Sequence, residues 1–326
     1  MAKGIGRLFQ IGIVRETSRG TPITTPTFMI PFAELDMDDK DARVIDEQSR
    51  GIIEGSVSES IVKQWAEGTL KAPIGDRHFP LLLYALLGTL NTSGPADSAY
   101  THTITVAQSS QHQSLTILVD DPLTAADYAH PLSVPTQLEI AYARGEFLTY
   151  TLGIKSKKGT PTAVTAAAVG ENRFLPQHLT FKTGTSQAGL TNATAIPLKS
   201  ATLRINQNIQ DDDVLGNIAP LDFLNKQFQI EGEIEAIWQN ESDFKTNSLL
   251  GTTVALRFDL VNTGTPIGVA TNPQLRIDLH KVIFQPVTRP LRLNDIVMQK
   301  LAFRAHYSTT DSKMVTITAV NAISSY

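Results

Sequence analysis

The feature that most constrains the fold of this 326-residue chain is a run of residues that returns in its second half. KQWAEG, at 63–68, is matched by KQFQIEG at 226–232. Two further matches flank these runs in the same order and at nearly the same spacing: IPF at 30–32 with IPL at 196–198, and LLG at 86–88 with LLG at 249–251. Because ordered matches at a kept spacing are typical of a repeated structural unit, we favour an internal duplication. A single domain that reuses similar strands and turns is the alternative.

Both halves have the residue pattern of β-strands separated by turns rich in Gly, Pro, Asn and Thr. The segments around the matched runs alternate apolar and polar residues with period 2, as half-buried strands do. Between the halves, GTPTAVTAAAVG from Gly159 is small and polar, which is typical of a linker. We therefore predict a mainly β chain with one unit over 1–158, a linker over 159–177 and a second unit over 178–326.

One short helix is predicted in each half. The first has Asp76 as its N-cap, Pro80 near its first turn and Gly88 just past its end. The second starts near Ser242 and ends at Gly251. Both helices are thus expected to close on a glycine that adopts a left-handed conformation.

The alternating strands carry one apolar and one polar face. In the second half, the apolar face includes Ile230, Ile234 and Ala236, and the opposite face carries a polar strip made of Asn225, Gln227, Gln229, Glu231, Glu233 and Glu235. The corresponding charged row of the first half is Glu59, Lys63, Glu67 and Lys71. A one-residue slip would bury each whole row, so the register is well specified. Such a face is either simply solvated or lines a wet space.

Composition excludes several classes of function. The net charge is −4, with 28 basic against 32 acidic residues, which does not favour a general polyanion binder. Cysteine is absent, which rules out disulfides, thiolate metal sites and a cysteine nucleophile. No HExxH, GxSxG or phosphate-binding glycine loop occurs, so we expect no catalytic residue, no metal and no cofactor. The longest apolar run, 81–87, is far shorter than the ~20 residues of a membrane span, and we expect a soluble protein.

Two acidic runs lie at comparable places in the two halves. DMDDKD at 36–41 falls in the connection 33–60, and DDD at 211–213 falls in the connection 201–221. Neither run has the glycine and terminal glutamate of an EF-hand loop, so charged loop tips are favoured over calcium sites. Long connections of this kind are usually functional.

Four elements of the first half resemble the tail tube (major tail) proteins of tailed bacteriophages. They are R-E-x-x-x-G-T-P from Arg15, E-x-x-R-G from Glu47, W-x-E-G-x-L from Trp65, and the helix that ends in LLG. TQLEIAYARGEFLTYTLGIKSKK, at 136–158, is similar to the closing strands of the same domain. The resemblance covers residues 4–158 and is weaker over the second half, where it depends on the internal matches.

The resemblance implies a β-sandwich or half-barrel with one flanking helix in each repeat. It also implies a structural virion protein, not an enzyme, that assembles in the host cytoplasm into stacked rings and forms the channel for genome ejection. A chain with two copies would form rings of three with pseudo-sixfold symmetry, in a non-contractile, siphophage-type tail. The implied partners are further copies of this chain, a tape-measure protein inside the tube, tail terminator and distal tail proteins at its ends, and double-stranded DNA that passes without sequence readout.

Within such a tube the polar rows become candidates for the channel wall. The residues expected to face the lumen are Lys63, Glu67, Lys71, Gln227, Gln229, Glu231, Glu233 and Glu235. The long connections become candidates for contacts between stacked rings, through Asp36, Asp38, Asp39, Arg43, Arg50, Asp211, Asp212 and Asp213.

Three other functions remain as alternatives. A DNA-encircling, clamp-like ring would need helices that present Lys or Arg to the channel, and the chain offers few helices. A carbohydrate-binding β-sandwich on the virion surface would need aromatics clustered on exposed loops, yet aromatics are 7% of the chain. A hydrolase is not supported by any triad or metal-ligand spacing.

Overall fold

The computed structural model describes the whole chain except residues 1–4, 123–126, 166–169, 239–243, 292 and 295. The fold is mainly β, as predicted, with large antiparallel sheets. The strands of the first half are β1 (Gln10–Arg15), β2 (Phe28–Ile30), β3 (Glu34–Asp46), β4 (Ser58–Pro73), β5 (Gly88–Ala96), β6 (Ala99–Val106), β7 (Leu115–Asp120), β8 (Asp127–Ala143), β9 (Thr149–Ser156) and β10 (Thr160–Thr162). Those of the second half are β11 (Leu179–Gly184), β12 (Leu198–Asn206), β13 (Ile209–Asp212), β14 (Asp222–Asn225), β15 (Gln229–Ile237), β16 (Val254–Val261), β17 (Gln274–Phe284), β18 (Met298–Ala305) and β19 (Val315–Asn321).

Two α-helices occur among the described residues, α1 (His78–Leu87) and α2 (Lys245–Leu250). Both end on a left-handed glycine, Gly88 with φ of 91° and Gly251 with φ of 62°, as predicted. None of the described helices combines the length and apolarity that crossing a membrane requires. The predicted cap at Ser242 lies outside the described residues.

The predicted N-cap of α1 is wrong. Arg77 holds the cap position, and the carboxylate that satisfies the helix start is Glu171, which accepts the backbone N–H of Arg77 at 2.7 Å and of His78 at 2.8 Å. Asp76 is buried and instead accepts bonds from the backbone and side-chain amides of Asn172. The residue that caps α1 therefore comes from the predicted linker.

The ends of the segment predicted as a linker are paired with the first half. β10 pairs with β8, and Gly75 forms a bridge with Arg173. Phe174 is 1% exposed and joins the main core. These parts of 159–177 are thus integrated in the fold, although their small polar sequence favoured a free linker.

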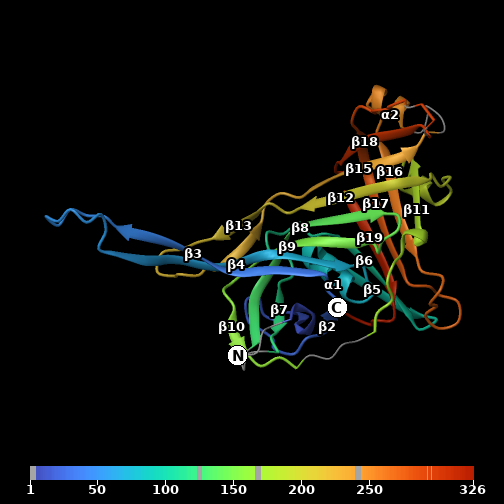
Figure 1. Cartoon of the computed structure of the whole chain (residues 1–326). Coiled ribbons are helices and arrows are strands. Elements are labelled where there is room, and N and C mark those ends of the chain that lie inside the picture. The colour runs from blue at the N-terminus through green and yellow to red at the C-terminus, as the bar shows by residue number, and fades with distance from the viewer. Residues whose placement is uncertain (1–4, 123–126, 166–169, 239–243, 292, 295) are drawn as a thin grey trace.

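One sheet runs across the whole molecule. Its strands pair in the order β3, β4, β9, β8, β12, β15, β18 and β17, and the step from β8 to β12 joins the two halves. Beneath it, further strands and α1 enclose the main core, which takes residues from both halves. β3 and β4 continue beyond this body as a long two-stranded arm (Figure 1).

The two halves have the same pairing order. Within the large sheet, β3-β4-β9-β8 corresponds to β12-β15-β18-β17. In the second layer, β1-β7-β8-β10 corresponds to β11-β16-β17-β19. The register shifts by one residue at matching places, between Leu115 and Ile117 of β7 and between Val254 and Leu256 of β16, with the extra residue on β8 and on β17. This correspondence supports our proposal that the chain is a tandem repeat, in which the described residues of the second half contain no counterpart of the β5–β6 hairpin.

Three buried histidines make the fold sensitive to acid. Burial lowers the pKa of His102, His112 and His130 below the ordinary value of 6.5. The three histidines therefore take up protons at a higher pH in the unfolded chain than in the folded chain. Their contribution to the free energy of unfolding is fully present above pH 6.5 and is lost as the pH falls below that value. We expect the melting temperature to be constant above about pH 7 and to fall steadily below about pH 6.5.

Calorimetry of the isolated subunit across this pH range would check the expectation. His130 is the best position for a test substitution, because its Nδ1 is buried without a hydrogen-bond partner. His130→Gln should therefore reduce the slope of melting temperature against pH. A melting temperature that rises on acidification would contradict the assignment.

Candidate functional site: a polar sheet face and a projecting arm

The large sheet has one face in the core and one face of polar side chains. On β15, Ile230, Ile234 and Ala236 are buried, and Glu231, Glu233 and Glu235 point the other way. Cross-strand partners share a face, so one row can be followed over seven strands as Glu34, Lys71, Thr151, Glu139, Arg204, Glu231 and Arg304. This row and its neighbours on the same side are named the polar face.

Most residues predicted to face a lumen do lie on the polar face. Glu67 and Lys71 are exposed on β4, and Gln229 stands with the three glutamates of β15. Gln227 does not belong to the strip, because β15 starts at Gln229 and residues 226–228 are irregular. The predicted strip from Asn225 is thus divided between the end of β14 and β15.

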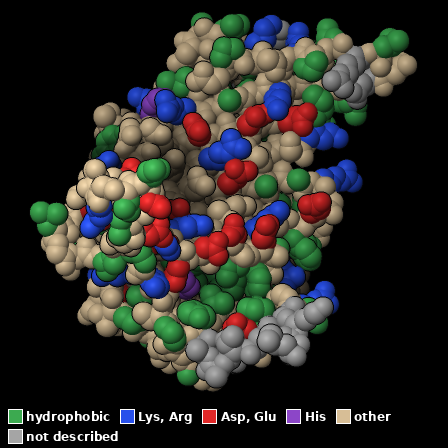
Figure 2. Space-filling model, turned by 60° about the vertical axis from the view of Figure 1, so that its left-hand side comes forward, with side chains coloured by type: hydrophobic (Ala, Val, Ile, Leu, Met, Phe, Trp, Pro, Cys, Tyr) green, Lys and Arg blue, Asp and Glu red, His purple; other side chains and the backbone are tan. Residues whose placement is uncertain are grey.

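The polar face is mixed in charge, not acidic throughout. Arg204 bonds Glu139 through Nε at 2.8 Å, and Lys300 makes an ion pair with Glu233. Arg304 lies opposite Glu231 across the β15–β18 pairing. Sequence reasoning missed these cations, although they stand at the polar positions of alternating strands. Figure 2 shows acidic and basic side chains intermingled on one side of the molecule.

Beyond the body, residues 40–65 form the arm. β4 pairs with β9 only from Ala66 onward, so the outer parts of β3 and β4 form a two-stranded ladder with each other. Near the root of the arm, Gln64 N–H also donates to the carbonyl of Ile218 at 2.8 Å. The connection 33–60, expected as a loop, is thus mostly strand. Asp is depleted in strands, but the side chains of Asp36, Asp38, Asp39 and Asp41 are exposed on β3 and stay hydrated.

The arm carries paired charges and exposed apolar side chains. Arg43 makes ion pairs with Asp41 and Glu59, and Arg50 makes one with Asp46. The apolar side chains that stay at least two-fifths exposed are Val44, Ile45, Ile52, Ile53, Val57, Ile61 and Val62. A concentration of exposed apolar side chains on one projecting segment is typical of a site that another molecule covers.

The residues predicted for contacts between rings divide into three places. Arg43 and Arg50 lie on the arm. Asp36, Asp38 and Asp39 lie on the part of β3 within the body, opposite Thr69, Glu67 and Ala66 of β4. Asp211, Asp212 and Asp213 belong to the β13–β14 hairpin.

The β13–β14 hairpin supports the root of the arm through ion pairs. Lys63 contacts Asp211 and Asp213 at 2.6 Å each, and Lys155 of β9 contacts Asp211 at 2.6 Å. Burial acts to raise the pKa of Asp211, but hydrogen bonds from Lys155 and Lys63 outweigh it and hold the pKa below its ordinary value. The Lys63 and Asp211 charges are thus paired within the chain.

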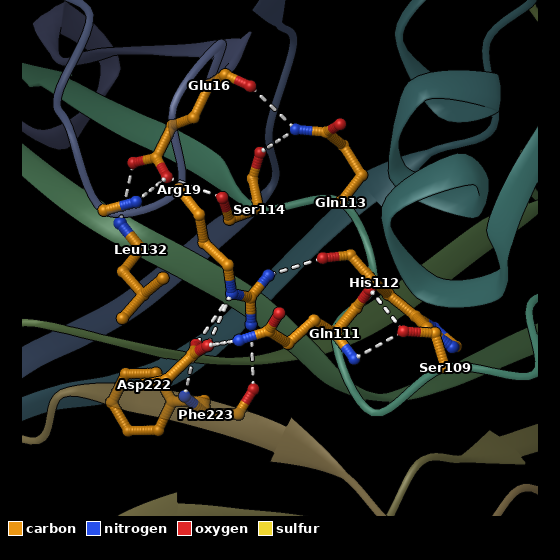
Figure 3. Close-up of polar contacts among 11 residues, drawn as sticks. Glu16, Arg19, Ser109, Gln111, His112, Gln113, Ser114, Leu132, Asp222 and Phe223 are labelled. Atoms are coloured by element: carbon orange, nitrogen blue, oxygen red, sulfur yellow. Dashed lines mark hydrogen bonds and ion pairs between the residues drawn. The ribbon is translucent and has the colours of Figure 1, made fainter.

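A polar cluster ties the β13–β14 hairpin to the first half (Figure 3). Arg19 donates to both carboxylate oxygens of Asp222, at 2.7 and 2.9 Å, and to the carbonyls of Phe223 and His112. Glu16 is 3% exposed. Its carboxylate accepts bonds from Gly20 N, Ser114 Oγ, Thr116 Oγ1 and Leu132 N. The R-E-x-x-x-G-T-P element is thus a structural turn, in which Glu16 closes onto Gly20.

Replacing Glu16 by glutamine should destabilise the subunit. The amide is uncharged and presents an N–H₂ group to a site that offers four donors, so at least one buried donor loses its acceptor. We expect a loss of about 3 kcal/mol in the free energy of unfolding. Urea unfolding would measure it, with Glu146→Gln in the exposed β8–β9 turn as the control. An unchanged unfolding midpoint would show that the cluster contributes no stability.

Among the described residues no group of three or more His, Asp or Glu side chains is placed to hold a metal ion. A family model described as phage tail tube protein matches residues 6–305. The match runs through both halves of the chain, including the second half, where the resemblance in sequence was weaker. No curated protein matches the chain.

Proposed function

The chain belongs to the phage tail tube protein family, and from this premise we propose that it forms stacked rings of three subunits through which a phage genome passes. The predicted family is thereby confirmed. Its members are structural proteins of the virion tail that assemble with copies of themselves into a tube. The ring size, the route of DNA and the contacts with tape-measure, terminator and distal tail proteins belong to the proposal.

The observation that carries the ring is the large sheet with its two open ends. Each chain contributes eight strands in one continuous order, from β3 to β17. Closing three chains edge to edge would make a barrel of 24 strands and leave no exposed edge. With strands ~4.8 Å apart and tilted ~40°, the backbone circle is roughly 50 Å across. Side chains leave a lumen of about 40 Å, which admits a B-form duplex of about 20 Å.

The polar face suits the wall of such a channel. A wall rich in Lys and Arg would gain affinity at every phosphate through counterion release and would retain DNA. Here Arg204, Lys300 and Arg304 stand beside Glu139, Glu233 and Glu231, so each cation already faces a carboxylate. The wall therefore offers water-binding groups without a continuous positive surface.

Reversing charges on this wall should make the tube hold DNA. Glu231→Lys with Glu233→Lys removes two carboxylates from each chain and leaves Arg304 and Lys300 without the carboxylates that they face, while Arg204 keeps its pair with Glu139. We expect assembled tubes of this variant to retain duplex DNA at low salt and to release it as salt rises, while unmodified tubes retain none. Co-sedimentation with labelled DNA would measure this, with Glu146→Lys as the control. Equal retention by both would contradict the wall assignment.

The arm suits contacts along the tube axis. It extends beyond the body, and its apolar side chains are exposed on the single chain. We assign their cover to the neighbouring ring, where burial would stabilise the stack. The clamp-like alternative is disfavoured because α1, with nine of its residues buried, cannot present a basic face to a channel.

Electron microscopy and mass measurement of the purified full chain test the proposal. We expect tubes or stacked rings with a central hole, and a ring mass of three times 35.5 kDa. A reconstruction should place Glu67, Lys71 and the three β15 glutamates on the inner wall. Particles that stay at the mass of one chain, or that lack a bore, would overturn it.

A further inference from the structure

The junction between the two halves is a complete example of how one such unit joins the next. β8 and β12 pair over seven positions, from Ala143 opposite Ser200 to Gln137 opposite Asn206. On the polar face the junction carries the Arg204–Glu139 pair at 2.8 Å. On the other face Tyr142 is buried and stacks on Phe258, with ring centroids 5.2 Å apart.

The two ends of the large sheet are the counterparts of these joined strands. Among the described residues, β3 pairs with β4 alone. The segment 285–291, which continues β17, pairs on its β18 side, where Thr288 and Lys300 exchange two backbone hydrogen bonds of 3.0 Å. Within the described residues no strand pairs on the other side of that segment.

The register of the halves gives the residue equivalences. Leu203 of β12 lies opposite Gly232, and Met37 of β3 lies opposite the matching Gly68, so Arg204 corresponds to Asp38. Similarly, Pro135 of β8 lies opposite Ile154, which pairs with Gly68. Phe284 of β17 lies opposite Phe303, which pairs with the matching Gly232. Pro135 therefore corresponds to Phe284. Continuing along both strands, Glu139 lies opposite Thr151 and Thr288 opposite Lys300. Glu139 therefore corresponds to Thr288.

We propose that residues 286–291 of one subunit pair antiparallel with β3 of a second copy, in the register of the β8–β12 junction, with Thr288 opposite Asp38. The inference rests on the ring proposed above and names the strands that close it. The same register places Val287 opposite Asp39, Arg289 opposite Met37, and Leu291 opposite Leu35.

The backbone of the segment is compatible with a new ladder in spite of its two prolines. Pro286 and Pro290 have the same parity as Thr288, whose N–H and C=O point to β18. Their missing N–H groups therefore fall on the β18 side. The N–H and C=O of Val287 and Arg289 alternate with these and point to the opposite side. The prolines thus leave the outward ladder intact, in keeping with the confinement of strand prolines to edges.

Where the proposed junction differs from the β8–β12 junction in its side chains, the differences on its two edges are complementary in charge. At the inner junction, Ile140 of β8 lies beside Leu203 and diagonal to Ile205, and all three are buried. In the corresponding places the chain has Arg289 on one edge and Asp39 on the other. An apolar pair on the inside is replaced by a cation and a carboxylate, which lie diagonally across the proposed junction and can pair.

A groove beside β3 matches the end of the segment. It has a volume of about 430 Å³ and is lined by Ile11, Phe32, Leu35, Met37, Val119 and Tyr128 among others. In the first half, Val119 pairs with Ile11 on one side and Tyr128 on the other. In the second half, Phe258 pairs in the same way with Phe181 and Ile277, so Val119 corresponds to Phe258. The corresponding space beside β12 is filled by Tyr142 of β8, which stacks on Phe258. At the proposed junction, the residue that corresponds to Tyr142 is Leu291. Leu291 is 73% exposed on the single chain, and the groove of a second copy would bury it.

Disulfide trapping tests the register, because the chain has no cysteine of its own. Because the backbone groups of Thr288 bond to β18, its pairing with β3 on the other side would be a non-hydrogen-bonded one. Opposed Cα atoms in such pairs are ~4.5 Å apart, a separation that suits a disulfide. Oxidised rings of the Asp38→Cys/Thr288→Cys variant should run as covalent dimers and trimers on a denaturing gel and return to single chains on reduction. Glu139→Cys/Arg204→Cys should crosslink within one chain. Glu34→Cys/Thr288→Cys, four residues out of register, should not join subunits.

A charge exchange gives a second readout. Asp39→Arg and Arg289→Asp should each raise the concentration needed for ring formation by about tenfold or more, and the double variant should restore it. Rings that form but neither crosslink at 38–288 nor respond to the exchange would overturn the junction and leave the ring itself standing. If the unmodified chain forms no rings, the proposed function fails and the junction with it.

Discussion

Tube formation should be lost when Ile52 and Ile53 at the arm tip are replaced by aspartate, while the subunit stays folded. Ile53 is fully exposed and Ile52 is 55% exposed, so the fold does not depend on them. Burial of such a side chain against a neighbouring ring is worth roughly 1.5–3 kcal/mol, so each arm loses two contributions of that size. The aspartates would in addition have to leave water without a partner.

Sedimentation and electron microscopy would measure the fraction of subunits in tubes, and the melting temperature would report on the fold. Leu249→Asp is the matched control, since Leu249 is 75% exposed and its helix, α2, lies away from the arm (Figure 1). The control should form tubes of normal length. Tubes of normal length from the Ile52→Asp/Ile53→Asp variant would show that the arm tip is not a contact between rings.

The polar face shows how far the sequence alone can determine a site. Alternation along one strand was enough to place Glu231, Glu233 and Glu235 opposite the buried Ile230 and Ile234, because side-chain direction in a strand depends only on parity. It could not place Arg204 or Lys300 beside them. Those neighbours depend on which strands pair and in what register, and that is set by contacts far apart in the chain.

Local rules also failed where a distant segment replaced a local solution. The sequence around Asp76 has the acid that an N-cap requires, but the structure buries Asp76 on Asn172 and caps the helix with Glu171. The apolar arm was missed for a related reason. Ile52 and Ile53 lie among turn-forming residues, and only the geometry shows that no part of the same described chain covers them.

The surfaces of the subunit divide according to what they have to do. The arm and the groove beside β3 present apolar side chains that gain free energy when they are covered. The polar face, which the proposal exposes to DNA, presents charges that are already matched, as in the Arg204–Glu139 pair. In the proposed tube the apolar surfaces would thus face other subunits, and the surface that meets DNA would be the one with the least to gain from binding it.

The two matched glycines should be the least replaceable positions in the sheet. At Gly68 an added Cβ would lie 1.8 Å from the carbonyl oxygen of Asp36, and at Gly232 it would lie 2.3 Å from that of Thr202. Both obstacles are backbone atoms of the neighbouring strand, which cannot rotate away as a flexible side chain can. Asp36 and Thr202 occupy corresponding places in β3 and β12. The same close approach is thus made twice, which accounts for the glycine in both Glu-Gly matches.

We expect Gly68→Ala and Gly232→Ala each to lower the free energy of unfolding by about 3 kcal/mol or more, because the neighbouring strand must move to admit the methyl group. Gly68→Ala should have the larger effect, since its three nearest atoms are all backbone with the closest at 1.8 Å, whereas two of the three at Gly232 belong to the Phe303 side chain, the nearer at 2.5 Å. Gly55→Ala, with nothing within 4 Å, is the matched control and should be neutral. Urea unfolding of the three variants measures the difference. Midpoints for Gly68→Ala and Gly232→Ala equal to that of the control would mean that β3 and β12 do not approach β4 and β15 this closely, and the proposed equivalence of the two halves would lose its firmest support.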